Sequence, residues 1–231
     1  MIAAGLERFG PFFTLELHPP GSFVEPWRPM AELVDSGAVG KRITAVAHGL
    51  AAAGPITPDA VPSAVSASVA QLGLVARLAA PAVGAAVLDL KLPRFRLSAL
   101  GWQDRLGGGF PLALTSEDSG SSESWAVACI LDDAVEPITT AVRDYAGVSE
   151  RVLWGNVASS INSAAVLIGR SAPALADRAF TIAQELLRDT RLADETGEPG
   201  PGFRRHSCCL IYQLSGSTEA VCGDCVLGGR D

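Results

Sequence analysis

Four of the five cysteines in this chain of 231 residues lie close together near its C-terminal end. Cys208 and Cys209 are adjacent, and Cys222 and Cys225 follow after a gap of twelve residues, with two residues between them. Four thiolates are the usual ligand set of a [2Fe–2S] cluster and also of structural zinc. The spacing of the cysteines therefore predicts a metal centre in this segment.

The adjacent pair of cysteines favours iron over zinc. Zinc sites with four cysteines normally use two spaced pairs, each of which closes its own chelate turn. Adjacent side chains diverge in extended backbone, which suits a centre with ligand positions at both ends. A thioredoxin-like site would use Cys222 and Cys225 but would leave the other pair without a role. Structural zinc and free or disulfide-bonded thiols remain as alternatives.

The C-terminal run resembles a known family. Two adjacent cysteines, a loop and a two-spaced pair are similar to the C-terminal [2Fe–2S] domain of the FhuF-type ferric siderophore reductases, and the matching residues include Arg204, Arg205, Cys208, Cys209, Leu210 and Tyr212. The run from Trp154 to Ala158 resembles the helical region of the same family. The loop between the pairs is two residues longer here than in the enteric members, around Gly216.

The resemblance implies an oxidoreductase that reduces Fe(III) in a siderophore, of the hydroxamate type, by one electron. Hard oxygen ligands hold Fe(III) strongly and Fe(II) weakly, so electron transfer alone releases the metal. Because the sequence contains no flavin or nicotinamide motif, we expect a separate electron donor, a ferredoxin or a flavin reductase. A zinc-stabilised binding module and a [2Fe–2S] electron-transfer or redox-sensing protein are the competing interpretations.

Three residues just before the first cysteine pair carry positive charge or can acquire it: Arg204, Arg205 and His206. Positive charge stabilises a reduced cluster, so these residues are candidates for tuning its potential. They are equally candidates for docking a donor or substrate, or for simple exposure to solvent. His206 is not expected to be a ligand, because four cysteines already complete the set.

The overall composition restricts the class of protein. A net charge of −7 argues against binding the phosphate backbone of nucleic acid. The N-terminus lacks the basic start and apolar run of a secretory signal. The most apolar stretch, Val69 to Leu90, contains Arg77, Pro81 and Asp89, so we expect no integral membrane segment. These features predict a cytoplasmic protein.

The periodicity of apolar residues predicts the elements that position the cysteines. A helical stripe runs through 62–80, and further helices are expected after Pro137, after Ser149 and over 173–190. Strands are predicted at 88–92, 110–114 and 125–131, forming a small central antiparallel sheet. A solvated loop is expected at 116–124, and Gly147 is expected to cap a helix.

The sequence thus predicts an α+β fold that is helix-rich, with a small central antiparallel sheet and a short C-terminal cysteine segment. Residues 1–200 form the helix-rich domain, which we expect to bind substrate, and residues 201–231 form the [2Fe–2S] segment, after a linker at 193–202. Cys129 lies in an apolar run and is expected to be a small buried hydrophobe. Packing or surface roles are expected for His18 and His48. Trp154 and Asn156 are expected on a packed helix face, with a position facing the substrate cavity as the alternative.

Overall fold

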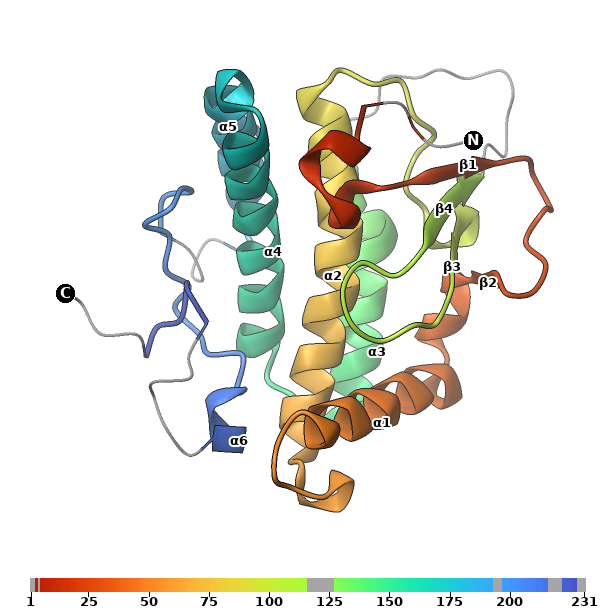
Figure 1. The fold of residues 1–231 in the computed structure, drawn as a ribbon, viewed down its shortest axis with the longest axis vertical. Helices are drawn as coiled ribbons and strands as arrows, with labels where there is room; N and C mark the ends of the chain where they lie inside the picture. The colour runs from red at the N-terminus through yellow and green to blue at the C-terminus, as the bar shows by residue number, and fades with distance from the viewer. Residues whose placement is uncertain (1–2, 4, 116–126, 193–196, 216–221, 228–231) are drawn as a thin grey trace.

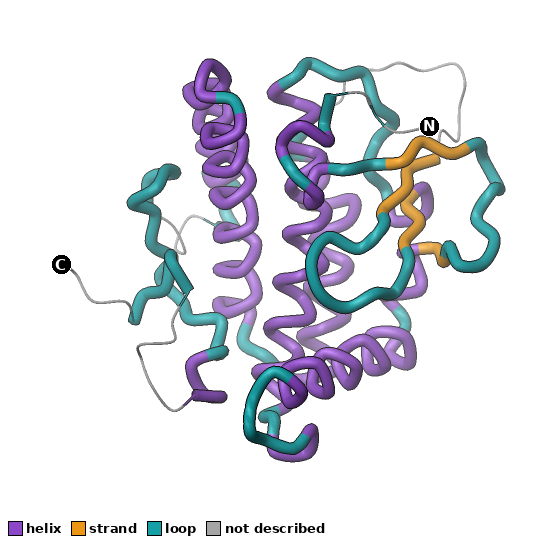
Figure 2. Tube along the Cα trace, viewed as in Figure 1, coloured by secondary structure: helices purple, strands orange, loops and turns teal. Residues whose placement is uncertain are grey.

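The structure is a computed structural model that describes residues 3, 5–115, 127–192, 197–215 and 222–227. Its α-helices are α1 (Ser36–Ala52), α2 (Ser63–Val87), α3 (Glu136–Ala146), α4 (Glu150–Ser171), α5 (Ala176–Leu187) and the short α6 (Tyr212–Ser215). Its strands are β1 (Glu16–His18), β2 (Arg28–Pro29), β3 (Leu100–Trp102) and β4 (Leu112–Thr115). Helices dominate and the strands form one small sheet (Figures 1 and 2), which confirms the predicted helix-rich α+β class.

The long helices α2 and α4 pack against each other at the centre of the fold (Figure 1). The apolar stripe predicted for α4 is buried along its whole length, and its members are Leu153, Val157, Ile161, Ala164 and Ile168. On α2, Leu74 and Leu78 are fully buried in the same core. A stripe at helical spacing buries its apolar area against a neighbouring helix, which stabilises both elements.

Helix ends follow the local sequence. Asp35 precedes α1, and its carboxylate accepts hydrogen bonds from the N–H groups of Gly37 and Ala38 at 2.8 and 3.2 Å. Gly147 ends α3 with a φ of 64°, a left-handed conformation that glycine adopts at little cost, as predicted. These ends set the turn that starts α4 at Glu150.

The sheet is mixed and has the strand order β1-β4-β3-β2. The pairs β2 with β3 and β3 with β4 are antiparallel, as expected, whereas β1 runs parallel to β4. The strand predicted at 110–114 corresponds to β4. Strands β1, β2 and β3 were not predicted, because at two or three residues each they are too short to show an alternating pattern.

Two predicted strands are wrong. Residues 88–92 contain no strand, because α2 continues to Val87 and Asp89 then turns the backbone with a φ of 53°. The alternating leucines there pack partly buried against the core without any strand partner. Residues 127–131 are a turn followed by helix, and a π-helical turn over Leu131–Val135 leads into α3. The predicted loop at 116–124 lies outside the described residues.

A buried guanidinium joins the sheet side of the molecule to α2. Arg77 is 1% exposed and donates to three backbone carbonyls, those of Phe12, Thr14 and Phe110. Burial lowers the pKa of Arg77 to about 10, so the group is still charged at neutral pH. One side chain therefore satisfies three acceptors from two separate parts of the chain.

By length and composition, α2 and α4 are apolar enough to cross a membrane, contrary to the expectation that no stretch would qualify. In each helix 72% of the most apolar window is buried inside the fold. A helix at the centre of a core is apolar on most of its faces, so burial accounts for this composition. The two helices are weak support for a membrane span.

We expect the Arg77→Leu variant to lose about 3 kcal/mol of unfolding free energy, because it leaves buried carbonyls without a donor. Arg77→Lys should recover only part of this, since a lysine cannot match the guanidinium's fork of donors. Urea unfolding measures both, with the exposed Arg170→Leu as control. Equal stability of the Arg77 and Arg170 variants would contradict the assigned role.

Candidate metal centre

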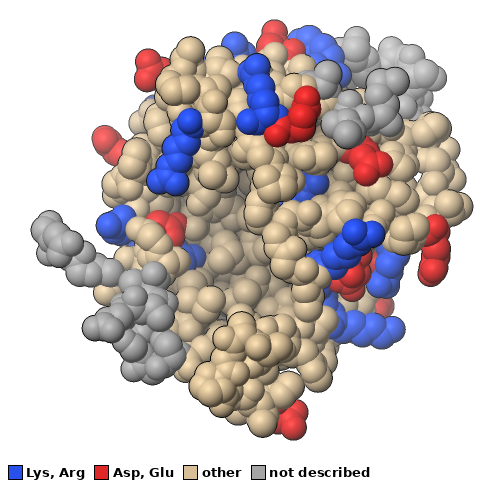
Figure 3. Space-filling model, viewed as in Figure 1, with Lys and Arg blue, Asp and Glu red and all other residues tan. Residues whose placement is uncertain are grey.

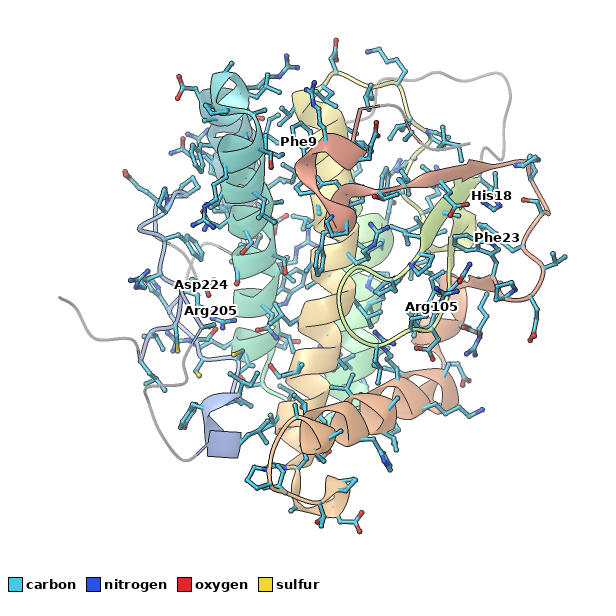
Figure 4. All side chains as sticks on the ribbon, viewed as in Figure 1. Phe9, His18, Phe23, Arg105, Arg205 and Asp224 are labelled. Atoms are coloured by element: carbon cyan, nitrogen blue, oxygen red, sulfur yellow. The ribbon has the colours of Figure 1, made fainter. Side chains whose placement is uncertain are left out.

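The C-terminal segment lies against α4, on the side of the molecule away from the sheet (Figures 1 and 4). Asn162 of α4 holds it at Gly200, where the asparagine amide both accepts from the backbone N–H at 2.7 Å and donates to the carbonyl at 3.2 Å. Phe203 is 2% exposed and belongs to the main core. The segment is therefore packed onto the helical body before the first cysteine is reached.

The two halves of the segment are joined by hydrogen bonds to backbone carbonyls. The Arg205 N–H donates to the Asp224 carbonyl at 3.1 Å, and the Arg204 guanidinium donates to the Gly223 carbonyl at 2.8 Å. A turn is closed by the Cys225 N–H, which donates to the Cys222 carbonyl at 3.1 Å. These bonds bring the adjacent cysteine pair and the spaced pair to one place.

The four sulfurs meet as two pairs. The Sγ atoms of Cys208 and Cys225 are 3.8 Å apart, and the Cys222 thiol hydrogen-bonds the sulfur of Cys209. Each pair takes one cysteine from the adjacent pair and one from the spaced pair. Cys209 and Cys225 are buried, whereas Cys208 and Cys222 are half-buried.

The pairing fits two metal atoms better than one. Two thiolates on a tetrahedral metal with bonds of about 2.3 Å have their sulfurs about 3.8 Å apart, which is the separation of Cys208 and Cys225. Each sulfur pair is therefore spaced to share one metal atom, and two such pairs fit the two iron atoms of a [2Fe–2S] cluster.

Backbone N–H groups point at the sulfurs on both arms. The Leu210 N–H lies 3.4 Å from Cys208 Sγ, and the Leu227 N–H lies 3.4 Å from Cys225 Sγ. Leu210 has a φ of 70°, which costs a non-glycine residue about 1–2 kcal/mol. This turn aims its amide at sulfur, and such hydrogen bonds stabilise negative charge on thiolates.

Arg205 is the charged group buried beside the sulfurs (Figure 4). It is 1% exposed. One terminal nitrogen of its guanidinium donates to Cys222 Sγ at 2.7 Å, and the other donates to Asn156 Oδ1 at 2.8 Å. Burial alone lowers the pKa of Arg205, but Cys222, Cys209 and Asp224 outweigh it and raise the pKa. The guanidinium stays charged.

The thiols differ strongly in acidity. A hydrogen bond from Cys222 and the nearby Arg205 lower the pKa of Cys209 to about 5, although burial opposes this. Burial raises the pKa of Cys208 to about 11, and the bond to Cys209 together with burial raises that of Cys222. Among these three thiols, Cys209 is therefore the one that loses its proton most readily. Metal binding must displace protons from Cys208 and Cys222.

Three buried polar atoms of the segment have no partner among the protein atoms described. The donors are Nε of Arg205 and the hydroxyl of Ser207, which is 7% exposed, and the acceptor is Oδ2 of Asp224. Buried donors in native proteins are almost always paired. The sulfides of a [2Fe–2S] cluster are acceptors of the kind that these donors lack, so the residues present fit this cofactor.

A buried polar chain continues from Arg205 into the helical body. Asn156 Nδ2 donates to the carbonyl and hydroxyl of Ser68 and to Gln71 Oε1, and Gln71 in turn donates to Thr139. These residues lie on α2, α3 and α4, and all are buried. Sequence reasoning placed Asn156 on a packed helix face, which is confirmed, but missed its partners. The available signal was polar Gln71 inside an apolar helix.

The remaining candidate residues lie away from the sulfurs or are exposed to solvent beside them. Arg204 and His206 are exposed. Cys129 was expected to be buried but is half-buried, because it lies in the first turn of the helical run before α3 and not in a strand. His18 bonds Glu16 at 3.0 Å and packs beside Phe23 and Trp27, whereas His48 is exposed. Trp154 is 8% exposed, as expected of a packed face.

Four cysteine sulfurs in two pairs beside a buried cation are suited to an iron–sulfur centre. Comparison with known families agrees: residues 205–227 match the FhuF 2Fe-2S C-terminal domain, and this range includes all four clustered cysteines. The resemblance drawn from the sequence motif is thereby confirmed for this segment, and the cofactor is a [2Fe–2S] cluster. No curated protein matches the chain.

We expect alanine at any one of the four clustered cysteines to abolish or strongly reduce iron and acid-labile sulfide, because each metal atom then lacks a thiolate. Cys129→Ala is the matched control and should keep the visible absorption of the wild-type protein. Anaerobic purification followed by iron and sulfide assay measures this. Loss of colour in the Cys129 variant alone would contradict the assignment.

Proposed function

We propose that this protein is a ferric siderophore reductase, which transfers one electron to Fe(III) in a siderophore of the hydroxamate type and so releases Fe(II). The observation that supports it is the FhuF-type segment, with four cysteine sulfurs in two pairs beside a buried arginine. When bound, the [2Fe–2S] cluster supplies and accepts single electrons. The substrate iron is reduced as the cluster is oxidised, and no proton transfer is required.

We propose the four clustered cysteines as the cluster's ligands. Cys208 and Cys225 would hold one iron, and Cys209 and Cys222 the other, because these are the sulfurs that lie together. The N–H groups of Leu210 and Leu227 would stabilise thiolate charge on the first pair. Arg205 would do so on the second pair.

The charged residues before the first cysteine pair would have different roles, because one is buried and the others are exposed. Buried Arg205 would tune the potential, since a cation beside sulfur favours the reduced centre. Exposed Arg204 would dock an electron donor at the surface beside the cysteines. The role of exposed His206, in tuning or in docking, remains a prediction.

The helical body of residues 1–200 would bind the siderophore, and residues 201–231 would carry the cluster. Figure 3 shows the surface hollowed in the middle of one face, where α4 lies in Figure 1, with charged side chains mainly around the rim. We further propose a cytoplasmic location and a separate electron donor, a ferredoxin or flavin reductase. The net charge of −7 supports the exclusion of nucleic acid as a partner.

Stopped-flow oxidation of the dithionite-reduced protein by ferric hydroxamate siderophores tests the function. We expect rapid return of the oxidised spectrum, with one Fe(II) per electron trapped by a ferrous chelator. The gallium(III) complex of the same siderophore is the control, because it has a similar size and charge but cannot be reduced.

The outcomes separate the alternatives. A colourless protein that holds zinc would indicate a zinc-stabilised binding module. A protein with the cluster that no ferric siderophore reoxidises faster than buffer would be an electron-transfer or redox-sensing protein instead, and the reductase proposal would be dropped.

We expect Arg204→Gln to slow reduction of the oxidised protein by a ferredoxin a few-fold at low salt, because acidic donors are steered by exposed cations. The difference should vanish at about 1 M salt, where the Debye length is about 3 Å. Arg188→Gln removes one exposed positive charge from α5's end and is the matched control. Equal slowing in both variants would refute a docking role for Arg204.

A further inference from the structure

We infer that Asn156 is a positioning residue for the [2Fe–2S] centre: from inside α4, its side chain fixes Arg205 against Cys222 and thereby raises the reduction potential of the cluster. The inference rests on the cofactor and on the proposed cysteine ligands, and not on which acceptor takes the electron. It extends the site from the cysteine segment into the helical body.

The Arg205 guanidinium is held from two opposite directions. One terminal nitrogen donates to Cys222 Sγ at 2.7 Å and the other to Asn156 Oδ1 at 2.8 Å. Its backbone is held separately, by the N–H bond to the Asp224 carbonyl at 3.1 Å. A long, flexible side chain needs a second anchor to stay in one orientation, and Asn156 supplies it.

The orientation of the Asn156 amide is fixed by its surroundings. Its nitrogen faces three acceptors on α2, the carbonyl and hydroxyl of Ser68 and Gln71 Oε1, at 3.0–3.1 Å. Its oxygen faces the guanidinium. A flipped amide would set N–H groups against N–H groups and acceptor against acceptors, so only one orientation is stable.

Burial makes this contact matter for the cluster. Asn156, Ser68 and Gln71 are 0% exposed and Arg205 is 1% exposed. Charges interact more strongly where water is excluded, so a cation fixed next to a ligand sulfur stabilises the electron added on reduction. If the guanidinium lost its anchor it would move toward Asp224 or solvent, and the reduced state would be less favoured.

A double-variant cycle tests the inference with mediated redox titration and EPR of the reduced cluster, without any siderophore. Asn156→Ala should lower the midpoint potential and shift the g values, and Arg205→Met should lower the potential at least as much. In the Arg205→Met background, Asn156→Ala should then have little further effect, because its route to the cluster is gone. Asn162→Ala is the control, since the hydrogen bonds of Asn162 to the described part of the segment are to Gly200.

The results discriminate clearly. A wild-type potential in Asn156→Ala, or additive shifts in the double variant, would overturn the positioning role. A shift of the midpoint potential of the same size in Asn162→Ala would also overturn the positioning role, because it would show that any loosening of the segment has this effect. A wild-type protein that carries no cluster would refute both the assigned cofactor and the proposed function. An Asn156 variant that carries the cluster at the wild-type potential would refute this inference alone.

A second measurement applies even if the Asn156 variants fail to fold. Wild-type protein grown with ¹⁵N-arginine should show nitrogen hyperfine coupling to the reduced cluster in pulsed EPR, arising from the N–H···S contact of Arg205. The coupling should persist in Arg204→Gln and disappear in Arg205→Met. Its absence from the wild-type protein would also refute the inference.

Discussion

The structure around the cysteines depends on the burial of one positive charge. Removing a guanidinium from water is expensive unless its donors find strong acceptors. Arg205 is 1% exposed and meets a cysteine sulfur on one side and an amide oxygen of α4 on the other. The cation that favours negative charge on sulfur is therefore also the contact that joins the cysteine segment to the helical body. Cofactor chemistry and docking of the segment rely on the same interaction.

The helical body is built to receive that charge. Asn156 sits where α4 crosses α2, and each of its polar atoms has a partner, so its burial is compensated. The chain of hydrogen bonds continues through Gln71 to Thr139, across three helices. A network of this kind tolerates little rearrangement, because any displaced member leaves a buried group unpaired. The rigidity of α2 against α4 is thus transmitted to the guanidinium.

Local chemistry was readable from the sequence, and long-range placement was not. The cysteine spacing, the α4 stripe and the Gly147 cap are encoded within a few residues of each other, and each was predicted. The leucines at 88–92 alternate like a strand but lie in a turn and loop, because alternation records packing and not strand pairing. Asn156 and Arg205 are 49 positions apart in the sequence, so no local sequence pattern predicts their contact. The pairing of individual sulfurs likewise depends on how the two arms fold together.

The sulfur pairs are interleaved, with Cys208 beside Cys225 and Cys209 beside Cys222. A metal atom held by either pair would therefore connect the two arms of the segment, so two metal atoms would connect them at two points. Neither arm alone contains both members of a sulfur pair, so neither pair is complete until the two arms have come together. Separation of the arms would therefore open both pairs at once.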